Sequence, residues 1–430
     1  MSTTSLVDVA PKFQDKVGKT EIPAATMHSA LTALKLLGVD CSYDVFHDKR
    51  IIGGQVLGSE VGQVSDDVCL LIRELCRQRF KFDPGVNPTW DAINLACRLN
   101  SFHPVVDYLD SVKWDGKKRI GTWLHDYMKA PDTPFVRAVG ELVLVASVRR
   151  VRQPGCKYDY MVVLESGEGT NKSKALAMLY GAENFSDQSI LGVSDRELQE
   201  AFRGRWGVEA ADLSGMRKAE VEKVKAQITR QEDRGRPAYG RAVINVPRTV
   251  VPWGTTNDAE YLRSQTGNRR FLPTPVGRID ITALMLDRDQ LWAEAAFVED
   301  LGGEISLPEN LWRAAAIEQN KRTMGDPWQE EIESALADVE RHEAERAAAH
   351  NRKEAANPFA YYEDKDDGER RITSHFLLSL ALGIKAGQQS AECGKRVGVV
   401  MRKLGWVGPE PLRIGGRVTK GYRLPSDPLA

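Results

Sequence analysis

One segment near the middle of the chain constrains the fold more than any other. Residues 159–165 are mainly apolar and predict a short buried strand, and residues 166–171 form a glycine-bearing turn. Lys172 and Ser173 then begin a helical pattern. A strand, a tight turn and a helix N-terminus in this order are the layout of a phosphate-binding loop. In such a loop the lysine reaches the β and γ phosphates and the next hydroxyl ligates Mg²⁺.

Two residues of this turn depart from the usual pattern G-x-x-x-x-G-K-[ST]. Ser166 and Asn171 stand where that pattern has its glycines. Asn tolerates a positive φ better than most non-glycine residues, so we expect a left-handed backbone conformation at Asn171. The competing interpretation is a strand–turn–helix corner that binds nothing. The candidate nucleotide-binding residues are Gly167, Gly169, Thr170, Asn171, Lys172 and Ser173.

Three further segments carry polar side chains that suit phosphate chemistry. Glu209 and Asp212 follow a short apolar strand, where carboxylates can complete a Mg²⁺ shell and polarise an attacking water. Asn257 ends a β-branched run, and its amide can contact the γ-phosphate or that water. Arg269 and Arg270 share a turn and are candidates for an arginine finger that acts in trans. Taken singly, these segments also fit a solvated helix start or ordinary surface charge.

Several motifs in a fixed order carry a resemblance to a known family. They resemble the virulence-associated protein E family of phages and mobile elements, whose members are similar to superfamily 3 replicative helicases. The motifs are Glu165–Ser173, Arg205–Glu209, Gly254–Asn257, Thr266–Phe271 and Leu291–Ala295, with Asn100–Leu109, Trp114–Gly116 and Pro154–Tyr158 upstream.

The resemblance implies an α/β fold with a P-loop core like those of AAA+ and superfamily 3 helicase ATPases. It implies ATP and Mg²⁺ as ligands, with Ser173 and Glu209 as metal ligands. It also implies a homo-oligomeric ring, a hexamer by family likeness, that acts on single- or double-stranded DNA. A separate primase or host replication proteins are expected as further partners.

The net charge of −1 gives no global electrostatic reason to bind nucleic acid, so DNA contacts must come from local basic segments. Residues 223–241 form one such segment, at the place where superfamily 3 helicases carry a hairpin that grips DNA. Lysine and arginine supply phosphate contacts there, and a tyrosine can stack on a base. A solvated, ion-paired helix face is the alternative, because acidic residues are interspersed. The candidates are Lys225, Arg230, Arg236, Tyr239 and Arg241.

The C-terminal residues form the second basic segment. Residues 372–430 contain nine basic and three acidic residues, and their pattern predicts helix, helix and β-hairpin, as in a winged helix. Arg402 and Lys403 are the candidate DNA contacts. A winged helix that binds protein is the alternative. Residues 340–371 are predicted to be a charged linker in front of this domain, in which a charged helix runs into a flexible segment.

The remaining boundaries follow from composition and pattern. We expect a flexible N-terminus over residues 1–20, a mainly helical region over 21–150, the ATPase core over 151–300 and a helical extension over 301–339. No apolar run reaches the length of a membrane helix, and the six cysteines lack the spacing of a zinc site. These features favour the cytoplasm of a bacterial host cell and exclude a disulfide scaffold.

Two functions fit the sequence best. The first is an ATP-dependent DNA helicase or translocase for replication of a phage or mobile element. The alternative is a nucleotide-gated DNA-binding regulator with weak ATPase activity and no unwinding. An assembly factor with an inactive site is a third, weaker interpretation. Strand displacement on a forked substrate separates the first two.

Overall fold

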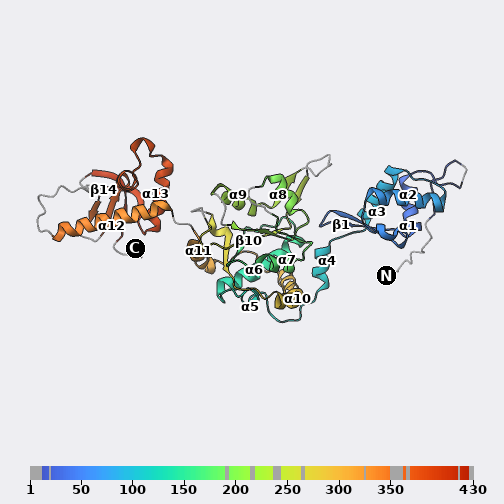
Figure 1. Cartoon of the computed structure of the whole chain (residues 1–430), viewed down its shortest axis with the longest axis horizontal. Helices are drawn as coiled ribbons and strands as arrows, with labels where there is room; N and C mark the ends of the chain where they lie inside the picture. The colour runs from blue at the N-terminus through green and yellow to red at the C-terminus, as the bar shows by residue number, and fades with distance from the viewer. Residues whose placement is uncertain are drawn as a thin grey trace, which may run out of the picture. The chain divides into compact units, whose positions relative to one another are not determined.

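The computed structural model describes residues 12–18, 21–188, 193–213, 218–235, 244–262, 267–323, 326–348, 362–364, 369–414 and 417–425. Contacts divide the chain into two compact units, Met1–Arg322 and Thr323–Ala430 (Figure 1). Among the described helices, none combines the length and the apolar character needed to cross a bilayer.

A parallel five-stranded sheet forms the centre of the first unit. Its strand order is β11-β5-β10-β7-β6, and every neighbouring pair runs parallel. Because the strands are parallel, their carboxyl ends meet at one edge, where polar residues after different strands can converge. The strands are β5 (Met161–Glu165), β6 (Phe185–Ser186), β7 (Gly207–Ala210), β10 (Val251–Thr256) and β11 (Phe271–Pro275).

Helices cover both faces of this sheet, which explains why β5 is apolar at consecutive positions. Val162 and Leu164 belong to one core cluster, with residues of α6, α7 and α10. Met161 and Val163 belong to another, on the opposite face, with residues of α9. Figure 1 shows α9 on the side opposite α6, α7 and α10. The helices are α6 (Pro134–Arg152), α7 (Lys172–Tyr180), α9 (Lys218–Ile228), α10 (Ile281–Asp300) and α11 (Trp312–Lys321). The α/β fold with a parallel sheet is therefore confirmed.

Three fully buried tryptophans contact Tyr180, the last residue of α7, and a fourth, Trp123, packs against Trp253. Their indole N–H groups are satisfied, as burial requires. The Tyr180 hydroxyl accepts from Trp253 Nε1 at 2.9 Å, and Trp206 Nε1 donates to the Ser147 carbonyl at 2.8 Å. Trp292 Nε1 donates to the Leu179 carbonyl at 2.9 Å. These bonds fix the C-terminal end of α7, the helix that begins at Lys172. The buried tryptophans are Trp123, Trp206, Trp253 and Trp292.

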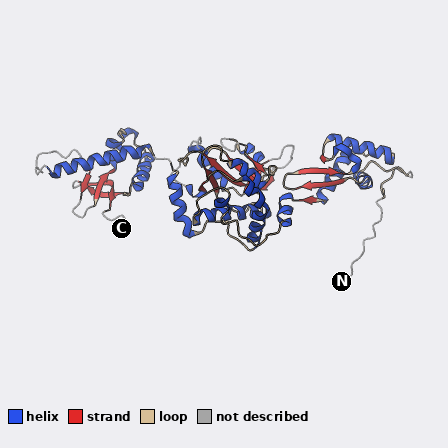
Figure 2. Cartoon of the chain, turned by 60° about the horizontal axis from the view of Figure 1, so that its bottom comes forward, coloured by secondary structure: helices blue, strands red, loops and turns tan. Residues whose placement is uncertain are grey.

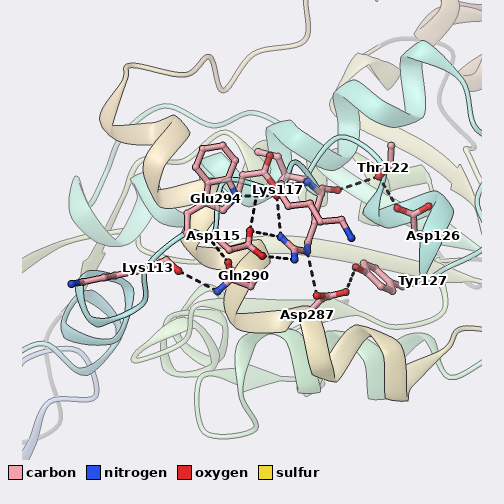
Figure 3. A network of polar contacts seen from close by, with 12 residues as sticks. Lys113, Asp115, Lys117, Thr122, Asp126, Tyr127, Asp287, Gln290 and Glu294 are labelled. Atoms are coloured by element: carbon pink, nitrogen blue, oxygen red, sulfur yellow. Dashed lines mark hydrogen bonds and ion pairs between the residues drawn. The ribbon is translucent and has the colours of Figure 1, made fainter.

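A polar network fastens the segment before α6 to α10 (Figure 3). Glu294 is 3 % exposed and accepts the backbone N–H groups of Arg119 at 2.5 Å and Ile120 at 3.0 Å. Burial raises the pKa of Glu294. The Arg119 guanidinium donates to both oxygens of Asp115, at 2.8 and 2.7 Å. The irregular segment thus has its backbone donors satisfied and its position fixed. The short helices of this region are α4 (Pro104–Ser111) and α5 (Trp123–Asp126).

The N-terminal part of the first unit was predicted to be mainly helical, and it also contains a sheet of order β3-β2-β1-β4. The strands are short and alternate poorly, so the sequence pattern misses them. His47, in the turn after β1, contacts Asp44 Oδ2 at 2.6 Å and Asn184 Oδ1 at 3.0 Å, which joins this part to the core. The elements are α1 (Met27–Leu37), β1 (Asp40–Asp44), β2 (Lys49–Gly53), η1 (Gln55–Glu60), β3 (Gly62–Gln63), α2 (Asp66–Phe80), α3 (Val86–Leu99) and β4 (Ser101–Phe102).

A two-stranded hairpin leaves the core between β7 and β10. Its strands β8 (Glu232–Gly235) and β9 (Ile244–Pro247) pair antiparallel, and α8 (Asp195–Phe202) packs nearby. Arg248 anchors the base of the hairpin, because its Nε and Nη2 atoms each donate to Asp233 at 2.7 Å. Arg248 is 5 % exposed and Asp233 is 7 % exposed, so the ion pair is buried.

The second unit contains an antiparallel sheet of order β12-β13-β15-β14, with helices beside it (Figure 2). Helix α12 supplies Ile332, Leu336 and Val339 to its core. Helix α12 therefore belongs to this unit, which begins before the expected boundary at residue 372. The C-terminal part of α12 lies where a charged helix was expected at the start of the linker. The elements are α12 (Pro327–Ala348), β12 (Tyr362–Asp364), β13 (Arg370–Thr373), η5 (Phe376–Ala381), η6 (Ala386–Gln388), α13 (Ala391–Lys403), β14 (Val407–Ile414) and β15 (Arg417–Leu424).

Candidate functional site

The predicted phosphate loop lies at the carboxyl edge of the central sheet, between β5 and α7. Asn171 takes φ 70° and ψ 27° at the N-terminus of α7, as its tolerance of positive φ predicts. Gly169 also has a positive φ, of 73°. The Ile279 N–H donates to the Thr170 carbonyl at 3.2 Å and fixes the loop from outside. The turn therefore has the left-handed residues that wrapping an anion requires.

Lys172 folds back over this loop. Its Nζ donates to the Ser166 carbonyl at 2.7 Å, the Ser166 hydroxyl at 3.0 Å and the Gly167 carbonyl at 3.2 Å. It also donates to Asn257 Oδ1 at 2.9 Å, so two of the predicted site residues meet. Burial lowers the pKa of Lys172, although the charges of nearby carboxylates oppose the shift.

Glu209 is fully buried at the end of β7 and lies next to the start of α7. Its Oε1 accepts from the Ser173 hydroxyl at 2.8 Å and from the Thr255 hydroxyl at 2.6 Å. Its Oε2 is buried too, and no described residue gives it a hydrogen bond. A carboxylate oxygen and a hydroxyl oxygen at one point are hard ligands that suit Mg²⁺. The half-satisfied carboxylate therefore fits the predicted metal site.

Thr255 was missed by the sequence analysis, although a signal was available. It stands two residues before Asn257 on β10, and side chains two apart on a strand share a face. The strand therefore presents two polar side chains to the carboxyl edge, and only the terminal one was predicted.

Glu165, the last residue of β5, is held by two residues that the sequence analysis did not select. Arg322 donates to its Oε2 through Nη2 at 2.6 Å and to its Oε1 through Nε at 2.9 Å. The Tyr261 hydroxyl donates to Oε1 at 2.8 Å. Burial, with the Glu165 charge, raises the pKa of Tyr261 well above its usual range. No local pattern links these positions, because Glu165 and Arg322 are 157 residues apart.

The remaining predicted catalytic residues do not contact Glu209 in the interactions described above. Asp212 follows β7 at the carboxyl edge, whereas Arg269 and Arg270 precede β11 and lie at the opposite, amino end of the sheet. Asp212 is exposed in the loop after β7 and has φ 52°. Arg269 is exposed and Arg270 is half-buried, both on the short turn η3 (Asn268–Arg270) before β11. Arg270 lies against Gly267, since a Cβ there would be 3.0 Å from its Nη1. The two arginines remain predictions for a site completed by a neighbouring subunit.

The residues predicted to contact DNA differ in how exposed their side chains are. Lys225 is 2 % exposed on α9 and pairs with Glu222 at 3.1 Å, and its burial lowers its pKa. In this conformation it faces the protein interior, which corrects the expectation of a DNA-facing side chain. Arg230 is half-buried, 4.0 Å from Asp233. Arg402 and Lys403 are exposed in the last turn of α13. Arg236, Tyr239 and Arg241 lie outside the described residues.

Comparisons with known proteins agree with this fold. The apo structure of the NrS-1 C-terminal region is 10 % identical over 91 % of this chain and 98 % of its own, with a TM-score of 0.51. The structure titled SCCmec type IV Cch, an active helicase, is 11 % identical over 90 % of this chain and 92 % of its own, with a TM-score of 0.35. The likeness to the NrS-1 C-terminal region shows a shared fold. No curated protein matches the sequence.

A family model gives the assignment. The model described as the virulence-associated protein E-like domain matches residues 109–324, which include the whole central sheet and the phosphate loop. This chain belongs to the virulence-associated protein E-like family.

Proposed function

We propose that the chain is an ATP-dependent DNA replication protein of the superfamily 3 helicase type, from a phage or mobile element. One observation supports this most. Three neighbouring segments of the sheet edge converge on the start of α7, where Ser173 contacts Glu209 and Lys172 contacts Asn257. A corner that binds nothing gains little from a fully buried carboxylate with one unpaired oxygen, because burying such a charge is costly.

Each residue has a defined task in the proposed P-loop site. Backbone N–H groups of the loop and of α7 bind the phosphate oxygens, and Lys172 places a positive charge on the β and γ phosphates. Ser173 and Glu209 would hold Mg²⁺. When bound, Mg²⁺ neutralises phosphate charge and orients the γ-phosphate. Asn257 positions the phosphate or the attacking water, and Asp212 accepts the proton from that water.

A ring of identical subunits, a hexamer by family likeness, would complete this site. Arg269 or Arg270 of a neighbouring subunit would then stabilise the charge that develops on the γ-phosphate. Both residues precede β11 and lie at the amino end of the sheet, away from the phosphate loop of their own subunit.

The second unit is the proposed DNA-binding domain. From α12 to β15, leaving out the short β12 and η6, its elements run helix, strand, helix, helix, strand, strand, which is winged-helix order. The last turn of α13 exposes Arg402 and Lys403, which suit phosphate contacts. In the first unit the β8–β9 hairpin stands between β7 and β10 in the chain, where a channel hairpin is expected.

Lys172→Ala tests the phosphate site. The parent protein should gain thermal stability on binding Mg·ATP and should hydrolyse ATP faster when single-stranded DNA is present. Lys172→Ala should remain folded and lose both effects, since it lacks the charge that binds the phosphates. Its melting temperature without ligand should fall somewhat, because the loop hydrogen bonds of Lys172 are lost as well. Stabilisation and hydrolysis equal to the parent's would show that the nucleotide binds elsewhere.

Strand displacement on a forked DNA separates the motor from the alternative, a nucleotide-gated DNA-binding regulator. A motor needs ATP turnover to displace the strand, so the parent should release it and Lys172→Ala should not. A parent that binds DNA in response to ATP, yet releases no strand as a ring of measured mass, would be the regulator. The Ser166 and Asn171 departures are the specific observation in favour of that alternative, because they depart from the usual loop.

A further inference from the structure

Strand β10 contacts both charged groups of the proposed nucleotide site. Asn257, just beyond its end, accepts from Lys172 Nζ at 2.9 Å. Thr255, on the same face of the strand, donates to Glu209 Oε1 at 2.6 Å. One rigid element therefore sets the relative positions of the lysine and the carboxylate, which lie on different segments.

The hydrogen bonds at Glu209 are unequally divided. Both hydroxyls, from Ser173 and Thr255, donate to Oε1, and among the described residues none donates to Oε2. A hydroxyl has one hydrogen to give, so each of these donors is fully used. The carboxylate is thereby fixed in rotation, with one oxygen engaged and the other left for a cation.

The two donors differ in how firmly they are held. Ser173 is exposed in the first turn of α7, and in the proposed mechanism its hydroxyl oxygen also ligates Mg²⁺. Thr255 is 5 % exposed inside a central strand, and its β-branched side chain has a stiff χ1. Thr255 is therefore the donor that keeps its position when ligands bind.

We propose that Thr255 is a positioning residue that orients Glu209 through Oε1 and leaves Oε2 for Mg²⁺. This inference rests on the proposed nucleotide site and adds a residue to it. Partners that orient a metal ligand are worth about 10- to 100-fold in metal affinity or activity. Loss of the Thr255 hydroxyl should therefore act on the metal and leave contacts between protein and phosphate in place.

Thr255→Val tests the proposal, because valine keeps the branched shape and removes the hydroxyl. Calorimetry should measure the affinity for a non-hydrolysable ATP analogue with Mg²⁺ and again with EDTA. We expect Thr255→Val to lose about tenfold in affinity with Mg²⁺ and to equal the parent in EDTA. Thr255→Ser, which keeps the donor, should restore the Mg²⁺ effect.

Thr256→Val is the matched control. Thr256 is the next residue of the same strand, 1 % exposed, and its hydroxyl accepts only from the Asp258 N–H, at 3.2 Å, among the interactions described. Thr256→Val should show any loss of affinity for the analogue that comes merely from removing a hydroxyl from β10. The ratio of its affinities in Mg²⁺ and in EDTA should equal the parent's ratio.

The outcomes separate this proposal from the function on which it rests. A parent that binds the analogue equally well in Mg²⁺ and EDTA has no metal site here, and the proposed function is then wrong. If the parent binds the analogue more tightly with Mg²⁺ than in EDTA, and a folded Thr255→Val variant keeps this full Mg²⁺ effect, the proposed role of Thr255 is wrong. The proposed function then stands. Should the valine variant fail to fold, Thr255→Ala gives the same test, and an undiminished Mg²⁺ effect there overturns the proposal equally.

Discussion

Ser166→Ala should tighten nucleotide binding, because the Ser166 side chain holds Lys172 in its ligand-free position. The Ser166 hydroxyl accepts from Lys172 Nζ at 3.0 Å and contacts the Thr170 hydroxyl at 2.6 Å. A glycine, the usual residue at this point of the pattern, offers neither contact. The lysine must leave some of its acceptors in the loop before it can reach a phosphate oxygen.

The size of the effect follows from the number of bonds lost. Lys172 Nζ has three hydrogens for four acceptors, so at least one hydrogen is shared, and one full hydrogen bond is the upper limit of what the alanine variant removes. A hydrogen bond to a charged group contributes about 1.5 kcal/mol at the low end of its range, which suits a partly exposed lysine. If the nucleotide breaks that bond on binding, its removal tightens binding by up to about tenfold.

Calorimetric titration with ADP measures this effect without hydrolysis. Thr170→Ala is the control, since it removes the contact between the two hydroxyls and keeps the one to Lys172, so it should not tighten binding. An affinity of Ser166→Ala that equals the parent's or falls below it would refute the reasoning. Such a result would mean that Lys172 keeps its loop contacts when the nucleotide binds.

Two further predictions concern stability. Arg119 holds the pKa of Asp115 well below its usual range, so Asp115 stabilises the fold above about pH 3.9 and loses this effect as the pH falls towards the folded-state value. Asp115→Asn should therefore have a lower melting temperature than the parent at neutral pH, and this difference should shrink as the pH falls. A difference that grows in acid would contradict the pairing of Asp115 with Arg119. Arg248→Met should remove both close hydrogen bonds of the buried Asp233 and leave it, among the described interactions, only Arg230, at 4.0 Å. The variant should lose about 3–5 kcal/mol of unfolding free energy in urea, and a loss below about 1 kcal/mol would contradict this role of the pair.

Local patterns in the sequence predicted the centre of the site. The apolar run of β5, the glycine-bearing turn and Lys172 are adjacent in the chain, so their arrangement follows from local backbone rules. Glu209 lies near the end of β7 and Asn257 directly follows β10, and parallel strands bring such residues to one edge. The contacts of Glu209 with Ser173 and of Asn257 with Lys172 are what that rule leads one to expect.

Contacts between distant segments could not be predicted in the same way. Lys225 looks like a surface lysine in the sequence, and only the packing of α9 against the sheet shows that it is buried. Arg322 and Tyr261 reach Glu165 from segments that no pattern connects to β5. The strands β1 and β2 are too short and too weakly alternating for a period to emerge. These features depend on which faces of the helices and strands pack against one another, and a single sequence does not contain that information in any local pattern.

The contacts on the two sides of Ser166 differ in strength, and this difference decides which part of the site can move. Glu165, on the strand side, is held by a nearly buried Arg322 and by Tyr261, and breaking such a buried pair costs about 3–5 kcal/mol. Ser166 and Lys172, on the loop side, are held by partly exposed hydrogen bonds of about 1.5 kcal/mol each. A bound nucleotide replaces the loop-side bonds with phosphate contacts, but it offers nothing in place of the ion pair. Rearrangement on binding should therefore stop at Ser166, with β5 and the Glu209 carboxylate already in their final positions.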